Sequence, residues 1–76
     1  MTLRIGDVAR ELDVTIPTVR FWSSAFHIPL ERQGKQRRYR QDALGRLRLV
    51  KQLLYKEKYS IEHARLHIQQ LSSGAW

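Results

Sequence analysis

The amino-acid sequence predicts a mostly α-helical domain with four helices and one short, basic β-hairpin. Three observations support this fold class. Apolar residues recur at the spacing of core-facing helices, residues that favour helix starts and stops separate these stretches, and a glycine lies between two short basic runs. A chain of 76 residues forms one domain with a small core. We expect the domain to occupy residues 1–71 and residues 72–76 to form a frayed tail.

The first two predicted helices are joined by a short turn. The first runs from about Gly6 to Leu12 after an extended lead-in over residues 2–5, with apolar residues at i, i+3, i+4 and i+7: Ile5, Val8, Ala9 and Leu12. Asp13 is expected to adopt the left-handed conformation in the turn, which Asp tolerates better than most residues. Thr15 is a favourable N-cap and Pro17 suits the first turn of a second helix that ends before Phe26. This pattern predicts a helix-turn-helix.

The segment after this pair predicts a basic hairpin. Pro29 prevents continuation of the second helix, and Phe26 and Ile28 are expected to close the core. Gly34 can supply a positive φ angle between two extended runs. Arginine and lysine dominate these runs, so we expect the hairpin to lie along a phosphate backbone. Tyr39 is the exception and is expected to pack against the helices.

Two further helices complete the predicted domain. The third runs from about Gln41 to Glu57, and its predicted buried stripe is Leu44, Leu47, Val50 and Leu54, with Leu53 at the edge. Ser60 is the expected N-cap of the fourth helix. The buried side of that helix is predicted to carry Ile61, Ala64, Ile68 and Leu71, while Leu66 points to a different face.

The net charge of +7 is concentrated in one segment. Residues 1–30 and 59–76 each balance to zero, whereas residues 31–58 hold ten basic against three acidic side chains. Charge confined to one segment is typical of a protein that binds a polyanion. The alternative is a solvated basic helix face.

Several classes of function are disfavoured. The chain has no cysteine, which excludes disulfides and cysteine metal sites, and no apolar stretch of signal-peptide or membrane-spanning length. We therefore expect a soluble cytoplasmic protein that does not bind membranes. His63 and His67 have i, i+4 spacing but lack a third ligand nearby, so no metal and no cofactor are expected. No nucleophile–base–orienter set is recognisable, so we do not expect an enzyme.

The order and spacing of several short motifs resemble the MerR family of bacterial transcription regulators. These motifs span about residues 3–71: Arg4-Ile-Gly-Asp-Val-Ala-Arg10, Val14-Thr15, Thr18-Val-Arg-Phe-Trp22, Arg37-Arg-Tyr39 and Ile61-Glu-His-Ala-Arg65. The resemblance implies a four-helix winged helix-turn-helix whose second helix enters the major groove. It also implies dimers that bind inverted repeats and distort the promoter spacer to activate transcription, or that repress it.

The resemblance and the charge pattern together define the candidate DNA-binding residues. On the second helix they are Thr15, Pro17, Thr18, Arg20, Phe21 and Trp22, although a core position for Trp22 is an open alternative. In the hairpin, which corresponds to the first wing, they are Arg32, Lys35, Gln36, Arg37, Arg38, Tyr39 and Arg40. In the second wing, between the third and fourth helices, they are Lys58 and Tyr59, followed by Ser60.

The sequence also departs from the family pattern. Phe21 replaces a common tyrosine, Ser23 a common acidic residue and Asp13 a common turn glycine, and the long dimerising helix of the family is missing. We therefore expect an isolated, monomeric domain of a larger regulator, or a naturally short relative such as a phage excisionase. The alternatives are an excisionase-like protein that bends DNA, and a basic face that docks an acidic, DNA-mimicking antirepressor.

Overall fold

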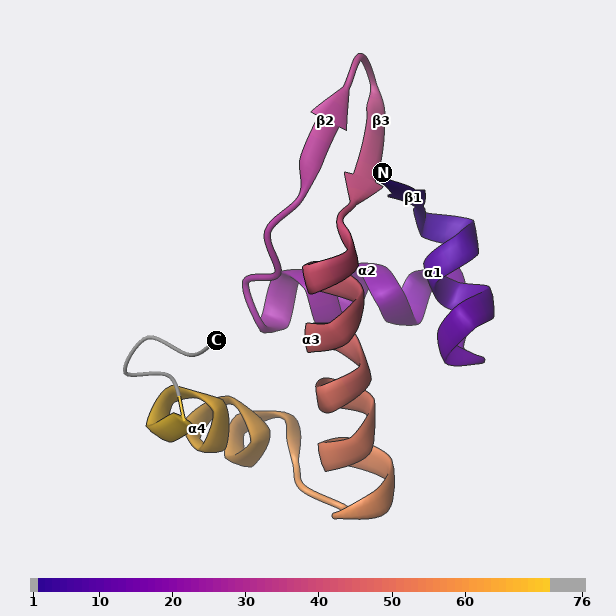
Figure 1. Cartoon of the computed structure of the whole chain (residues 1–76). Coiled ribbons are helices and arrows are strands. Elements are labelled where there is room, and N and C mark those ends of the chain that lie inside the picture. The colour runs from indigo at the N-terminus through magenta and orange to yellow at the C-terminus, as the bar shows by residue number, and fades with distance from the viewer. Residues whose placement is uncertain (1, 72–76) are drawn as a thin grey trace.

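The computed structural model describes residues 2–71, without the side chains of Gln33 and Leu71. The expected tail over 72–76 lies outside the described residues. Figure 1 shows four helices and a small sheet, which confirms the predicted fold class. The elements, in chain order, are β1 (Leu3–Arg4), α1 (Ile5–Leu12), α2 (Ile16–Ala25), β2 (Glu31–Gln33), β3 (Gln36–Tyr39), α3 (Gln41–Lys51), the π-helical turn η1 (Gln52–Lys56) and α4 (Ile61–Leu71).

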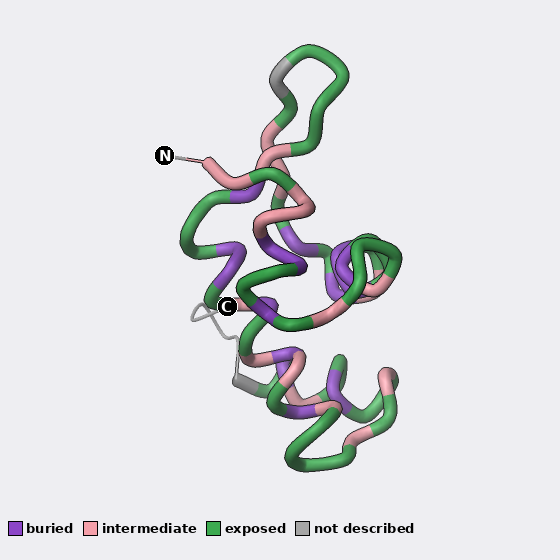
Figure 2. Tube along the Cα trace, turned by 90° about the vertical axis from the view of Figure 1, so that its right-hand side faces the viewer, coloured by how far each residue is buried: buried purple, intermediate pink, exposed green. Residues whose placement is uncertain are grey.

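The helices pack around α3, and the hairpin extends from one end of this arrangement. In Figure 1, α2 crosses behind α3, α1 stands beside them, and α4 lies at the end opposite the hairpin. Figure 2 shows the same molecule from its side, with α2 seen end-on, the hairpin above it and the α3–α4 connection below. The hairpin tip and the outer face of α2 are exposed, whereas the buried residues lie between the helices and at the base of the hairpin.

Both predicted N-caps are confirmed. The Thr15 hydroxyl accepts a hydrogen bond from the Thr18 amide at 3.3 Å, and the Ser60 hydroxyl accepts one from the His63 amide at 3.1 Å. Each bond satisfies an amide that has no partner within its helix. Local sequence therefore determines where α2 and α4 begin.

Three helical segments end at residues with left-handed backbone conformations, and none of these residues is glycine. Asp13 has φ 57°, His27 φ 53° and Lys58 φ 58°. After α1, the Val14 amide donates to the Ala9 carbonyl at 2.9 Å and the Asp13 amide to the Arg10 carbonyl at 3.2 Å. This pair of bonds is a Schellman motif, which reverses the chain after a helix. The left-handed conformation predicted for Asp13 is confirmed.

The sheet contains a third strand that the sequence does not predict. The lead-in forms β1, and the strand order is β1-β3-β2, with both pairings antiparallel. Leu3 lies opposite Tyr39, and Arg4 lies opposite Arg38. The hairpin turns at Gly34 with φ 63°, as expected. Pairing with β1 makes β3 the central strand and attaches the base of the hairpin to α1.

The core contains most of the predicted apolar residues, although Ile5, Leu54 and Ile61 are only partly buried. The predicted burial of Leu71 lies outside the described side chains. Val8, Val19, Leu47 and Val50 have no exposed surface, and Phe26 and Ile28 are also buried. Leu53 is buried, whereas Leu54 is only partly buried, so the predicted stripe is wrong at its last position. The reason is η1, in which the Glu57 amide donates to the Gln52 carbonyl, five residues back. A π turn contains an extra residue, which shifts the phase of the buried face.

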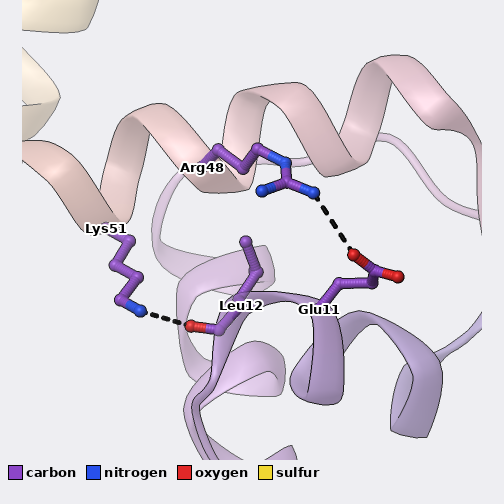
Figure 3. A network of polar contacts seen from close by, with 4 residues as sticks. All are labelled: Glu11, Leu12, Arg48 and Lys51. Carbon is purple, nitrogen blue, oxygen red and sulfur yellow. Dashed lines mark hydrogen bonds and ion pairs between the residues drawn. The ribbon is translucent and has the colours of Figure 1, made fainter.

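Polar contacts fix the end of α1 against α3. Figure 3 shows Lys51 donating to the Leu12 carbonyl, and Arg48 paired with Glu11 at 3.4 Å. A cation at the C-terminus of a helix interacts favourably with its dipole and with its unpaired carbonyl groups. The Arg48–Glu11 pair is exposed and contributes little on its own. Arg48 and Lys51 of α3 are therefore held by contacts with α1.

Replacement of Asp13 by glycine should stabilise the domain. Glycine adopts φ 57° without the steric cost that a Cβ atom imposes, and this cost is about 1 kcal/mol. We expect Asp13→Gly to raise the free energy of unfolding in urea by about this amount. Asp13→Asn is the matched control, because it removes the charge and keeps the Cβ atom. A lower unfolding free energy for Asp13→Gly than for Asp13→Asn would contradict the backbone argument.

Candidate nucleic-acid interface

The outward face of α2 contains Pro17, Arg20 and Phe21, three of the six residues on this helix that the sequence assigns to DNA. Val19, Trp22 and Ser23 are buried, while Ile16, Pro17, Arg20, Phe21 and Ser24 are exposed. Phe21 is 56% exposed, so its ring is accessible on this face. Arg20 makes no ion pair within residues 2–71. This face can therefore offer a guanidinium group and an apolar ring to a partner.

The start of α2 offers hydroxyl groups as well. The Thr15 and Thr18 hydroxyl oxygens lie 2.7 Å apart and share one hydrogen bond. Because each hydroxyl carries one hydrogen, the pair retains one O–H donor for an external acceptor. Thr15 is exposed and Thr18 partly buried, so an anion can reach this position.

Trp22 does not belong to the exposed face. Its residue surface is only 3% accessible, and its ring makes an edge contact with Tyr55 at 5.9 Å between centroids. The core alternative for Trp22 is therefore correct, and its assignment as a DNA contact is withdrawn. The helix turns by about 100° per residue, so the face opposite Arg20 and Phe21 is buried against α3. Periodicity alone left this position ambiguous.

Tyr39 is likewise buried, and its hydroxyl connects the hairpin to α2. The residue has no exposed surface, which confirms its predicted packing against the helices and removes its side chain from direct contact with DNA. Its hydroxyl lies 2.9 Å from the Ser23 hydroxyl, and Ser23 donates to the Val19 carbonyl at 2.6 Å. In this arrangement Tyr39 donates to Ser23, so both buried hydroxyl groups are satisfied. In the sequence alone, Ser23 is visible only as a departure from a family pattern.

The hairpin displays its charge outside the core. Arg32, Lys35, Gln36 and Arg37 are exposed, and Arg38 is partly buried. Arg40 is exposed but pairs with Glu31 at 3.2 Å. The Nε atom of Arg38 is buried and has no hydrogen-bond partner among the residues that the structure describes. Apart from Arg40, the basic side chains of the hairpin make no ion pair among the described residues, so they are available to a partner.

The α3–α4 connection contains the remaining candidates. Lys58 is exposed, and its left-handed backbone directs the chain into α4. Tyr59 is partly buried, and its ring stacks on His63 at 4.1 Å and meets His67 edge-on at 5.5 Å. The two histidines therefore pack around an aromatic ring. In the described part of the chain, no three His, Cys, Asp or Glu side chains gather as a metal site would require.

Two residues that help to position this surface were not predicted from the sequence. Arg4 joins the hairpin through the pairing of β1 with β3, and Tyr55 contacts the buried side of α2 through Trp22. Neither contact has a local signal, because both join residues distant in the chain. None of the helices that the structure describes is long and apolar enough to cross a membrane.

Fold and surface together define a helix-turn-helix protein with a basic hairpin, and comparison with known proteins identifies its family. A family model described as "MerR HTH family regulatory protein" matches residues 3–71, so the chain belongs to this family. It is a family of DNA-binding transcription regulators, not of enzymes. The chain is also 31% identical over 67 residues to the "Regulator protein TubY" of Clostridium botulinum C phage. The match covers 86% of this chain and 28% of that relative.

A double-mutant cycle should detect the buried bond between α2 and the hairpin. Tyr39→Phe removes the phenol donor and leaves the Ser23–Val19 bond intact, so we expect a loss of about 1 kcal/mol in unfolding free energy. Ser23→Ala should cost more, about 1–3 kcal/mol, because it leaves the buried Tyr39 phenol without a partner, and the double variant should lose less than the sum. Ser24→Ala, at an exposed position of the same helix, is the control for helix propensity. Additive losses would argue against a direct bond.

Proposed function

We propose that this domain binds double-stranded DNA in a sequence-specific manner, with α2 in the major groove. The observation that supports this most directly is the outward face of α2, where Arg20 and Phe21 are exposed on a helix whose other face is buried. The major groove of B-DNA accepts an α-helix, and arginine can bind guanine through two hydrogen bonds. Phe21 offers an apolar ring to the sugar or to a thymine methyl group.

In this proposal, the hairpin supplies most of the affinity. Arg32, Lys35 and Arg37 are exposed side chains suited to the phosphate backbone, and Lys58 would contact it from the α3–α4 connection. Neutralising a phosphate releases a counterion, so each such contact makes binding weaker as salt increases. Arg48 and Lys51 are not included, because both are held by α1.

We further propose that tight binding requires two copies of the domain. A single module buries about 600–1,000 Å² of protein surface on DNA. Dimers commonly place their two recognition helices about 34–36 Å apart, one helical turn of DNA. Because this chain spans only 28% of its relative, the part of a full-length regulator that would pair the domains is not defined by residues 2–71.

Replacement of a hairpin arginine should weaken binding to every DNA sequence. We expect Arg37→Ala to reduce the slope of log K against log salt concentration by about 0.9 and to leave sequence preference unchanged. Titration of a fluorescent duplex at four salt concentrations measures both effects. Arg65→Ala, an exposed arginine on α4, is the matched control for charge. An Arg37→Ala slope equal to that of the wild type would refute the backbone contact.

Replacement of Arg20 should instead change sequence preference. Loss of a guanine contact costs about 1–3 kcal/mol on the preferred site and little on unrelated DNA. Selection of bound sequences from random duplexes should show a strong motif for the wild type and a weaker one, degenerate at one position, for Arg20→Ala. If both proteins select the same motif with the same strength, α2 does not read that base through Arg20.

A further inference from the structure

We infer that a second phosphate site lies beside the hairpin, in a hollow formed by Arg4, Arg10 and Arg37, and that it binds the DNA backbone. The inference rests on the proposed DNA-binding function. It extends the proposed DNA-binding surface to β1 and α1, which lie outside α2 and the hairpin loop. The three arginines come from three different elements of the fold.

The hollow has a defined lining and a polar character. It has a volume of about 430 Å³ and is lined by Arg4, Ile5, Gly6, Asp7, Arg10, Gln36 and Arg37. Three of these side chains are cationic and one is anionic. The Asp7 carboxylate accepts a hydrogen bond from the Arg4 amide at 3.3 Å and lies 3.9 Å from the Arg10 guanidinium. The Arg10 side chain is 83% exposed, so this long contact does not hold it in place.

The sheet next to the hollow contains two unfavourable charge pairs. Arg4 lies directly opposite Arg38, and Arg32 lies directly opposite Arg37. Directly opposite residues have Cβ atoms about 4.5–5.5 Å apart, and like charges at this distance destabilise a sheet. Glu31, the acidic residue of the described strands, lies directly opposite Arg38 and pairs with Arg40. The Arg32–Arg37 pair has no acidic residue directly opposite it in the described strands, so its charge is left for an external anion to neutralise.

A phosphodiester is the anion that fits this position. The planar guanidinium group binds phosphate through two parallel hydrogen bonds, and three arginines are among the residues that line the hollow. Gln36 and Arg37 belong both to the hollow and to the hairpin that is proposed to follow the backbone. Figure 1 shows β1 and the start of α1 directly beside β3. A DNA strand that contacts the exposed hairpin arginines would therefore continue past the hollow, where its next phosphates meet Arg4 and Arg10.

Conservative replacement of Arg4 and Arg10 tests the inference in the intact chain. Arg4→Gln and Arg10→Gln should each reduce the salt slope by about 0.9, and the double variant by about 1.8. Between 50 and 200 mM salt, each single variant should then lose about threefold less affinity than the wild type does. The motif selected from random DNA should not change. Arg65→Gln is the control for loss of one charge, and Arg4→Lys should retain the slope because it keeps the cation.

A chemical change in the DNA locates the site. Duplexes with one uncharged methylphosphonate at successive backbone positions should identify phosphates whose neutralisation weakens the wild type and leaves Arg10→Gln unaffected. Arg10 is exposed, so this variant should have the thermal midpoint of the wild type and report binding alone.

The outcomes separate this inference from the proposed function. If the wild type binds duplex DNA and Arg37→Ala reduces the slope, while Arg4→Gln and Arg10→Gln behave as Arg65→Gln does, the hollow is not a phosphate site and the proposed function stands. If the wild type binds no duplex with a salt-dependent affinity, the proposed function fails first. Binding of polyglutamate that requires Arg4 and Arg10, together with DNA binding that does not, would assign the hollow to an acidic protein.

Discussion

The buried hydrogen bond between Tyr39 and Ser23 is the contact on which the geometry of the interface depends. Tyr39 ends the central strand of the sheet, and Ser23 lies on the inner face of α2. A phenol with no exposed surface needs a partner, because an unpaired buried hydroxyl costs free energy. The bond thus fixes where the base of the hairpin sits relative to α2. The positions of Arg37 and Arg38 on β3 relative to α2 therefore depend on this bond.

The ends of the helices constrain the same arrangement from the other side. Asp13, His27 and Lys58 all adopt left-handed conformations, and glycine would adopt them at lower cost. Each residue redirects the chain where one part of the proposed interface begins or ends: before α2, after α2 and before α4. The packing of α1, α2 and α3 offsets the free-energy cost of these three conformations. Lys58 also places a cation in the α3–α4 connection, which glycine could not provide.

The structure divides the basic segment into two groups with different roles. Arg48, Lys51 and Arg40 bind partners within the fold. Arg32 and Arg37 face each other across the hairpin, and Arg4 meets Arg38 on the other edge of β3. Electrostatic repulsion within the sheet is unfavourable for the isolated domain and favourable for association with a polyanion. If the sheet binds DNA as proposed, binding and stability make opposite demands on the same residues.

Features that depend on neighbouring residues could be predicted before the chain was folded. Hydroxyl caps at Thr15 and Ser60, the turn at Gly34 and the left-handed Asp13 all follow from local backbone chemistry, so each was predicted correctly. Features that depend on residues far apart in the chain could be seen only in the folded domain. The burial of Trp22, the third strand and the exchange of Leu53 for Leu54 required α3, β3 and η1 to be in place. Periodicity gives the face of a helix, but packing decides how far around that face the core extends.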